Sequence, residues 1–347
     1  MTILRLQSTN SPKISARITL FILSTLLSAA ASANTDCKLT LDDGTPAKFL
    51  DWVLPVINAD EFDPNVPNGT VLYRSTARAN GQGGRLVCPY GVGMLAYTVS
   101  TSRTGGGWDT YLTSIEGVGI RIKGGNPSIA HLWWPQFVNF GDNDKVLIML
   151  PGDQFTLELV KIGKITAGGK IQGLIGESTL VNTGYDVRKI SLPEDGIEVK
   201  PRVPSCALET KVVNVKLEGE ASALIGMREG PKTDFNLRLQ CSGGDPNTTT
   251  RMFIVFSDST NPSNRSSTLS LSKDSTAKNV GIEILRDNGE LVRYGPESGE
   301  ENQWMVGEFG NVPVDIKLRA RYVGTSMTLP PTVGSANANA TFTISYK

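Results

Sequence analysis

Hydrophobic and polar residues alternate with a period of two along much of the chain. The clearest run is VDIKLRARY, in which Val314, Ile316, Leu318, Ala320 and Tyr322 alternate with charged residues. This period places successive side chains on opposite faces of an extended strand. Shorter runs of the same kind contain Leu95, Tyr97 and Val99; Phe155, Leu157 and Leu159; Val213, Val215 and Leu217; and Phe235, Leu237 and Leu239. Because no long amphipathic helix interrupts them, the pattern predicts an all-β protein of short strands.

The chain ends in the same alternation. In ATFTISYK, residues 340–347, the apolar side carries Ala340, Phe342, Ile344 and Tyr346, and the polar side ends with Lys347. A half-buried strand at a chain end frays unless a neighbour pairs with it. The sequence therefore predicts a C-terminal strand that needs a partner.

Turn signals divide these runs into two sets. The 36 glycines and 19 prolines supply many turns, and 287–289 (DNG) is a hairpin signal. The motifs GQGG, TGGGW and GVGIRI lack the spacing of a phosphate-binding loop, so we interpret them as hairpin tips. Pro201 and Pro204 interrupt the chain in EVKPRVPSC and predict a linker at 200–205. We expect two tandem β-sandwiches, residues 34–199 and 206–347.

The N-terminus has the features of a secretory signal peptide. Lys13 and Arg17 precede an apolar stretch at 18–30, and Ala31-Ser32-Ala33 is a small-residue cleavage pattern, so residues 1–33 are expected to be removed. A membrane anchor is the alternative, but the stretch is shorter than the ~20 residues that a span needs. The remaining chain has 31 basic and 34 acidic residues, which gives no indication of nucleic-acid binding.

Secretion makes the four cysteines informative. An oxidising compartment and an even count favour disulfides, and three pairings are conceivable. We favour Cys37 with Cys88 and Cys206 with Cys241, because each pair closes a loop inside one domain. Neither pair has CxxC spacing, so neither a metal site nor a redox site is expected.

Catalytic chemistry is hard to build from this sequence. His131 is the single histidine, and in IAHLWWPQF it is expected to be packed or hydrogen-bonded rather than a general base. No free cysteine would remain as a nucleophile, although paired carboxylates of a glycosidase type stay open because their separation is spatial. We therefore expect a protein that is not an enzyme and that uses no cofactor.

The second half resembles the pilin domain of chaperone–usher fimbrial subunits of Gram-negative bacteria. The matching pieces, in order, are Cys206, VVNVKL, DFNLRLQC ending in Cys241, AKNVGIEILRDNGELVRYG, DIKLRARYVGT and GSANANATFTISYK with Tyr346 next to last. The resemblance implies an incomplete immunoglobulin-like sandwich that lacks its last strand. It also implies that a periplasmic chaperone, and then the donor strand of the next fimbrial subunit, fill the place beside Phe342, Ile344, Tyr346 and Lys347 during assembly at the outer-membrane usher.

What precedes the pilin domain suggests a position in the fibre. Shaft subunits of this family carry a short donor extension before the first pilin cysteine, whereas here a whole domain stands in that place. The layout is similar to the two-domain tip adhesins of type 1 and type 3 fimbriae. It implies export through the periplasm to the fimbrial tip on the cell surface.

The receptor-binding residues have to be sought by side-chain chemistry. RLVCPYGVG, GVGIRI and FTLELVKIGKITAGGKIQG are similar to stretches in fimbrial adhesin domains, which are lectin-like, but none identifies a ligand. Sugars stack on aromatic rings and bond to carboxylates and amides, so the candidates are Trp108, Asp109, Trp133, Trp134 and Gln136. The alternative is that each tryptophan packs in a core, and the glycine run before Trp108 makes it the expected exception.

Three functions stay open at this stage. The first domain is either a lectin for host glycans or a module that binds extracellular-matrix protein. The third is a shaft or adaptor subunit, which would need a donor strand at the mature N-terminus.

Overall fold

The computed structural model describes residues 37–56, 59–141, 143–226 and 228–347. The expected signal peptide, 1–33, lies outside the described residues. Strands dominate the rest, and the helices within these ranges are two single turns, η1 (Pro127–Ile129) and η2 (Ala221–Leu224). Neither of these described helices is long and apolar enough to cross a membrane. The prediction of an all-β protein is confirmed.

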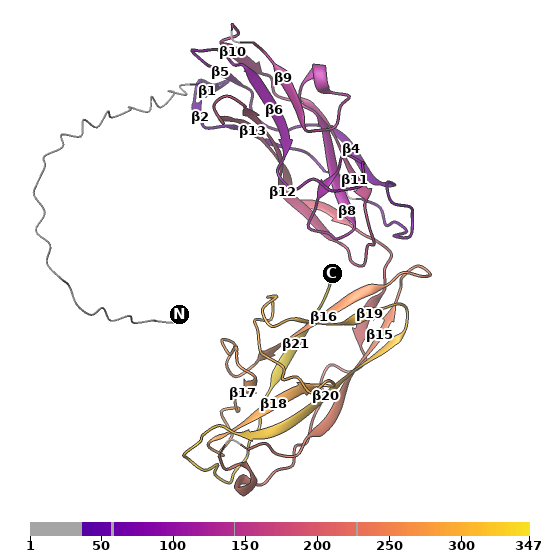
Figure 1. The fold of residues 1–347 in the computed structure, drawn as a ribbon, viewed down its shortest axis with the longest axis vertical. Coiled ribbons are helices and arrows are strands. Elements are labelled where there is room, and N and C mark those ends of the chain that lie inside the picture. The colour runs from indigo at the N-terminus through magenta and orange to yellow at the C-terminus, as the bar shows by residue number, and fades with distance from the viewer. Residues whose placement is uncertain (1–36, 57–58, 142, 227) are drawn as a thin grey trace, which may run out of the picture. The chain divides into compact units, whose positions relative to one another are not determined.

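Three sheets are formed by residues 38–199, which we call the first domain (Figure 1). In the order β10-β5-β1-β2, the first sheet contains β1 (Lys38–Leu41), β2 (Pro46–Ala47), β5 (Gly84–Val87) and β10 (Val146–Met149). In the order β4-β11-β8-β7, the second contains β4 (Val71–Arg78), β7 (Tyr111–Leu112), β8 (Val118–Gly124) and β11 (Gln154–Lys161). In the order β3-β13-β12-β6-β9, the third contains β3 (Leu50–Val53), β6 (Met94–Val99), β9 (Gln136–Asn139), β12 (Gly169–Leu180) and β13 (Asp186–Val199).

The first domain has a closed core. Strand alternation directs Phe155, Leu157 and Leu159 inward, where they are buried with Trp52 and Trp134. The rings of Trp52 and Trp134 each meet Phe155 edge to face, at centroid distances of 6.3 Å and 6.1 Å. A disulfide between Cys37 and Cys88 joins the chain at the start of β1 to the end of β5.

Two sheets are formed by residues 205–346, and we call residues 205–347 the second domain. In the order β14-β15-β20-β18-β17, the larger contains β14 (Ser205–Leu208), β15 (Thr233–Ser242), β17 (Thr268–Leu269), β18 (Val280–Arg286) and β20 (Pro313–Gly324). In the order β19-β16-β21, the smaller contains β16 (Thr250–Asp258), β19 (Trp304–Phe309) and β21 (Ala340–Tyr346). A second core lies between them, and the Cys206–Cys241 disulfide links β14 to β15. The chain therefore consists of two β domains.

The structure corrects three expectations from the sequence. Val213, Val215 and Leu217 do not form a strand, although their spacing is right. The motif GVGIRI is not a hairpin tip, because Val118–Gly124 is the central strand β8, with Val118, Ile120 and Ile122 buried. His131 is exposed rather than packed. The hairpin signal at 287–289 does mark a tight turn, in which the Gly289 amide donates to the carbonyl of Arg286 at 2.9 Å.

Candidate functional site

The last strand of the chain, β21, has a neighbour on one side only. It pairs antiparallel with β16, in a register that places Phe342 opposite Phe256 and Ile344 opposite Ile254. It ends the sheet order β19-β16-β21, which is visible in Figure 1 as the yellow strand beside β16. One edge of β21 is therefore open to another strand.

The alternation of hydrogen bonds along β21 shows which residues direct their backbone groups toward that open edge. The Lys347 amide donates to the carbonyl of Arg251 at 3.2 Å. In an antiparallel ladder, residues alternate between bonding to the partner strand and pointing their backbone groups away from it. Lys347 marks the bonded set, which contains Thr343 and Ser345, so Phe342, Ile344 and Tyr346 direct their N–H and C=O groups toward the open edge.

The same three residues direct their side chains toward the core and yet remain half-buried. All of them pack against the second core, and the Phe342 ring lies 5.6 Å from that of Phe256. By contrast, Val314, Ile316 and Leu318, the inward residues of β20, are buried. The core wall formed by β21 is thus less buried than the wall formed by β20.

Residues 209–217, which follow β14, are a second segment of interest, because they lie outside the strands. Val212 is 74% exposed, while Val215 and Leu217 are half-buried against the second core. The segment has the alternation of a strand and packs its apolar side, but it forms no strand. This is expected if the neighbouring strand that would bond to it is missing. We call Phe342, Ile344 and Tyr346, together with Val215 and Leu217, the acceptor edge.

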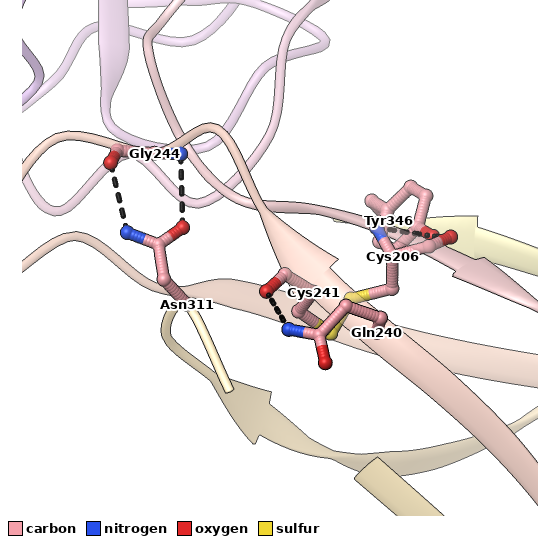
Figure 2. The surroundings of a disulfide bond; sticks show 6 residues. All are labelled: Cys206, Gln240, Cys241, Gly244, Asn311 and Tyr346. Carbon is pink, nitrogen blue, oxygen red and sulfur yellow. Dashed lines mark hydrogen bonds between the residues drawn. A yellow bond between two sulfur atoms is a disulfide. The ribbon is translucent and has the colours of Figure 1, made fainter. Parts of the chain in front are cut away.

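The two ends of the acceptor edge differ, since one is fixed by a side chain and the other borders a hollow. At one end the Tyr346 hydroxyl donates to the carbonyl of Cys206 at 2.8 Å and accepts from the Cys206 amide at 3.3 Å (Figure 2). At the other end lies an open hollow of about 480 Å³, lined by Leu217, Tyr322 and Ala336 among others. The Tyr322 hydroxyl donates to the Ala336 carbonyl at 3.1 Å.

Neighbouring contacts hold the disulfide end in place. The Gln240 side-chain amide donates to the Cys241 carbonyl, and the Asn311 side chain forms a pair of hydrogen bonds with the backbone of Gly244 (Figure 2). Burial raises the pKa of the Tyr346 phenol, which the hydrogen bond to Cys206 partly offsets. The final residue, Lys347, pairs with Glu300 at 2.7 Å. The end of β21 is therefore held by side-chain contacts, although its outer edge is unpaired.

The aromatic residues expected to bind a receptor separate into two groups. Trp108 and Trp133 are half-buried and share a neighbour, Arg121. The Arg121 guanidinium donates to the Trp108 carbonyl at 3.0 Å and stacks 4.4 Å from the centre of the Trp133 ring. Asp109 is paired with Arg103 at 2.5 Å, so its carboxylate is already engaged.

Trp134 does not belong with this group. It is 1% exposed, and its indole N–H donates to the Gly124 carbonyl inside the core at 3.3 Å. Consecutive residues of an extended segment point to opposite sides, so only one of Trp133 and Trp134 can face solvent. Gln136 donates to the Trp133 carbonyl at 2.8 Å and so supports the backbone there. The proposal of Trp134 as a receptor contact is wrong.

Sequence reasoning missed the charged residues beside Trp133. Arg74 of β4 and Arg121 of β8 flank Glu158 of β11, and Lys123 lies 4.7 Å from the Trp133 ring centre. The signal was present in RIK, where Arg121 and Lys123 flank the buried Ile122. No group of His, Cys, Asp and Glu able to hold a metal occurs among the described residues.

Comparison with known families gives a match for each domain. Residues 197–347 match the model of the family "Fimbrial protein", and residues 61–192 match the model "MrkD-like receptor binding domain". Together the two matches span most of the described chain in the order expected of a receptor-binding domain followed by a pilin domain.

Curated relatives include fimbrial adhesins. The F17c-G fimbrial adhesin of Escherichia coli is 33% identical over 152 residues, which cover 42% of this chain and 42% of the relative. A fimbria adhesin protein of Klebsiella pneumoniae is 29% identical over 207 residues, covering 56% of this chain and 61% of the relative. The chain thus spans less than two thirds of the length of these relatives.

Solved structures with some likeness include two adhesins. The CupB6 tip adhesin from Pseudomonas aeruginosa is 16% identical, with a TM-score of 0.38, and the match covers 89% of this chain and 93% of that one. The receptor binding domain of the adhesin MrkD1P of Klebsiella pneumoniae is 17% identical, with a TM-score of 0.32, covering 48% and 96%.

Proposed function

We propose that this chain, which belongs to the two-domain tip adhesins of chaperone–usher fimbriae, ends a fimbrium and attaches the bacterium to a receptor through its first domain. The single observation that carries the proposal is the unpaired edge of β21 in the second domain. Both matched families consist of structural and binding proteins, which supports binding rather than catalysis.

Strand addition explains how the second domain would join a fibre. An incoming strand would bond to the backbone groups of Phe342, Ile344 and Tyr346 and insert its alternate side chains beside theirs. A periplasmic chaperone would supply this strand first, and the neighbouring subunit would replace it at the outer-membrane usher. Filling the edge would also shield half-buried apolar surface that otherwise promotes aggregation.

The order of the two domains favours the end of the fibre over the shaft. A shaft or adaptor subunit would offer a donor strand just before its pilin domain. In the described part of this chain, the residues just before β14 instead follow directly from β13, which belongs to the first domain. The chain would therefore accept a strand from one neighbour, and its described residues just before the pilin domain are not free to act as a donor strand.

The test of position is immunogold labelling of fimbriae with antibody against the first domain. We expect one label at the free end of each fimbria, and loss of adhesion without loss of fimbriae when the chain is deleted. Label distributed along the shaft would contradict the proposal and favour the shaft subunit.

For the receptor we propose a class of molecule, either a host glycan or a matrix protein. Binding of the purified chain to a glycan array and to a panel of matrix proteins separates the two. The half-buried pair Trp108 and Trp133 is the part of the first domain where we expect contact.

A further inference from the structure

One outer face of the first domain concentrates positive charge. The strands β4, β11 and β8 are neighbours, and their register places Arg74 and Arg121 on either side of Glu158, with Lys123 beside Thr156 and Arg78 beside Gln154. The alternate residues of the same strands, such as Phe155, Leu157 and Ile122, are buried in the core. We call Arg74, Arg78, Arg121 and Lys123 the basic face.

The one acid within this face is already neutralised. Glu158 is 1% exposed, and its two oxygens accept from Arg74 Nε at 2.5 Å and Arg121 Nε at 2.8 Å. At the margins, Asp109 is paired with Arg103, and Asp153 is paired with Arg188 at 2.7 Å. Two cations held by one buried carboxylate leave an excess of positive charge on the surface.

Among the described residues, Arg74 and Arg121 are held in place by Glu158, whereas Arg78 and Lys123 are not paired with an acid. Arg121 is fixed by Glu158, by the Trp108 carbonyl and by the Trp133 ring, which also lies 4.7 Å from Lys123 Nζ. The Arg74 side chain remains 63% exposed although its Nε is bonded. Arg78 is exposed, and among the described residues neither Arg78 nor Lys123 has an acidic partner. A ligand therefore meets two guanidinium groups fixed on Glu158 and two cations that no described acid neutralises.

The rest of the domain shows that this charge is local. Residues 37–199 contain 14 Lys and Arg against 17 Asp and Glu, so the domain as a whole is acidic. On the third sheet the pattern of charges is reversed. There one cation, Lys189 of β13, lies between two acids, Asp51 of β3 and Glu177 of β12. An acidic domain with one basic face is suited to recognise an anion on that face.

The arrangement indicates an extended ligand. Neighbouring strands lie ~4.8 Å apart and residues two apart along a strand ~6.7 Å, so the four cations cover roughly 13 by 10 Å of a sheet surface. The hydroxyls of Thr76 and Thr156, 3.0 Å apart, lie between the cationic rows and can bond to sugar hydroxyls. A sheet surface of separated cations and hydroxyls fits a chain that carries several anionic groups.

We infer that the basic face binds an acidic polysaccharide, whose sulfate or carboxylate groups contact Arg74, Arg78 and Lys123. Arg121 acts as a positioning residue, because its nitrogens are committed to Glu158 and Trp108. The inference rests on the proposed receptor-binding role of the first domain and names the chemical class of its ligand.

The test uses the full chain purified with its chaperone, and heparin oligosaccharide as the probe. The variant Arg78→Gln/Lys123→Gln removes two cations that have no acidic partner. The matched control, Lys38→Gln/Arg85→Gln, removes two exposed cations from β1 and β5 of the first sheet. We expect the affinity for heparin to fall about tenfold in the first variant and to stay unchanged in the control, with a weaker salt dependence in the first.

Further arms separate the sources of negative charge. Desulfated heparin keeps only carboxylates, so binding to it as well as to heparin would assign carboxylate recognition, and loss of binding would assign sulfate. Heparin binding that is unchanged in the first variant, or equally reduced in the control, would overturn the inference. Equal binding to polyglutamate, or to neutral dextran, would overturn it as well.

Failure of the tip assignment gives a different result. If the chain were not a tip adhesin, immunogold label would be missing from fimbrial ends for wild type and both variants alike. If only the basic face were misassigned, all three proteins would appear at the tip and would bind heparin equally.

Discussion

At the residue scale, Phe342 has two roles on β21. Its side chain packs on Phe256, and its backbone faces the open edge. Truncation of fully buried rings costs about 3–5 kcal/mol, and we expect about 2–3 kcal/mol for Phe342→Ala because the ring is half-buried. The neighbour Thr343 is exposed on the other face, so Thr343→Ala should change little.

The measurement is recovery of each variant with the cognate periplasmic chaperone. Phe342→Ala should reduce recovery severalfold and Thr343→Ala should not. Equal recovery of the two variants would show that the chaperone does not bind along this strand.

Tyr346 gives a prediction about pH. Burial raises the pKa of its phenol, and burial raises that of the fully buried Tyr294 as well. An unfolded tyrosine titrates near pH ~10, so the stabilisation from the neutral phenols is complete below that pH and is lost as pH rises through the folded values. The unfolding free energy of the chaperone-bound chain should therefore fall above pH ~10.

The variant Tyr346→Phe removes both hydrogen bonds to Cys206 together with the titrating group. It should cost about 1 kcal/mol at neutral pH and make the alkaline decline shallower. An identical alkaline decline in wild type and in Tyr346→Phe would show that this phenol does not contribute.

At the scale of elements, the sequence predicted strands well where both neighbours are present. The runs in β11, β15 and β20 became strands in which most of the predicted core positions are buried, because each lies between two partners. The run at Val213, Val215 and Leu217 did not, since period-two spacing specifies a face but cannot supply a hydrogen-bonding partner. GVGIRI was misread because β8 is buried at consecutive positions and its glycines suggested a turn.

The candidate site, like the strands, was predictable only in part from the sequence. Phe342, Ile344 and Tyr346 were found from their alternation and from the family resemblance, whereas the basic face was missed. Its cations come from β4 and β8, and the distance between those strands in the sequence conceals that β11 brings them together. Trp134 was misassigned because its sequence neighbour, Trp133, points the other way.

The segment 209–217 provides a matched pair of variants at this scale. Val215 packs on the second core, whereas Val212 is exposed. Val215→Asp would place a charge on the acceptor edge and should abolish most chaperone recovery, because an unpaired charge is costly to bury. Val212→Asp should leave recovery near wild type, and equal losses for both would argue against a role for this segment.

At the scale of the whole molecule, the two domains differ in completeness. The first has a closed core and its own disulfide, while the second leaves the inward residues of β21 half-buried. We expect residues 34–199 to fold cooperatively alone, as judged by thermal unfolding and gel filtration. Residues 206–347 alone should aggregate or unfold, and a monomeric, cooperatively folded second domain without added peptide would contradict an incomplete sandwich.

The most direct test of the acceptor edge is residue-resolved amide hydrogen exchange along β21, in the chaperone complex and after release from the chaperone. In the complex, the amides of Phe342, Ile344 and Tyr346 should be protected together with those of Thr343 and Ser345, because a strand then lies on each side. After release, the expectation is that Phe342, Ile344 and Tyr346 lose protection first, with or without subsequent unfolding of the domain. Protection of these three amides that is the same in the released chain as in the complex would contradict it, because their edge would then already be filled.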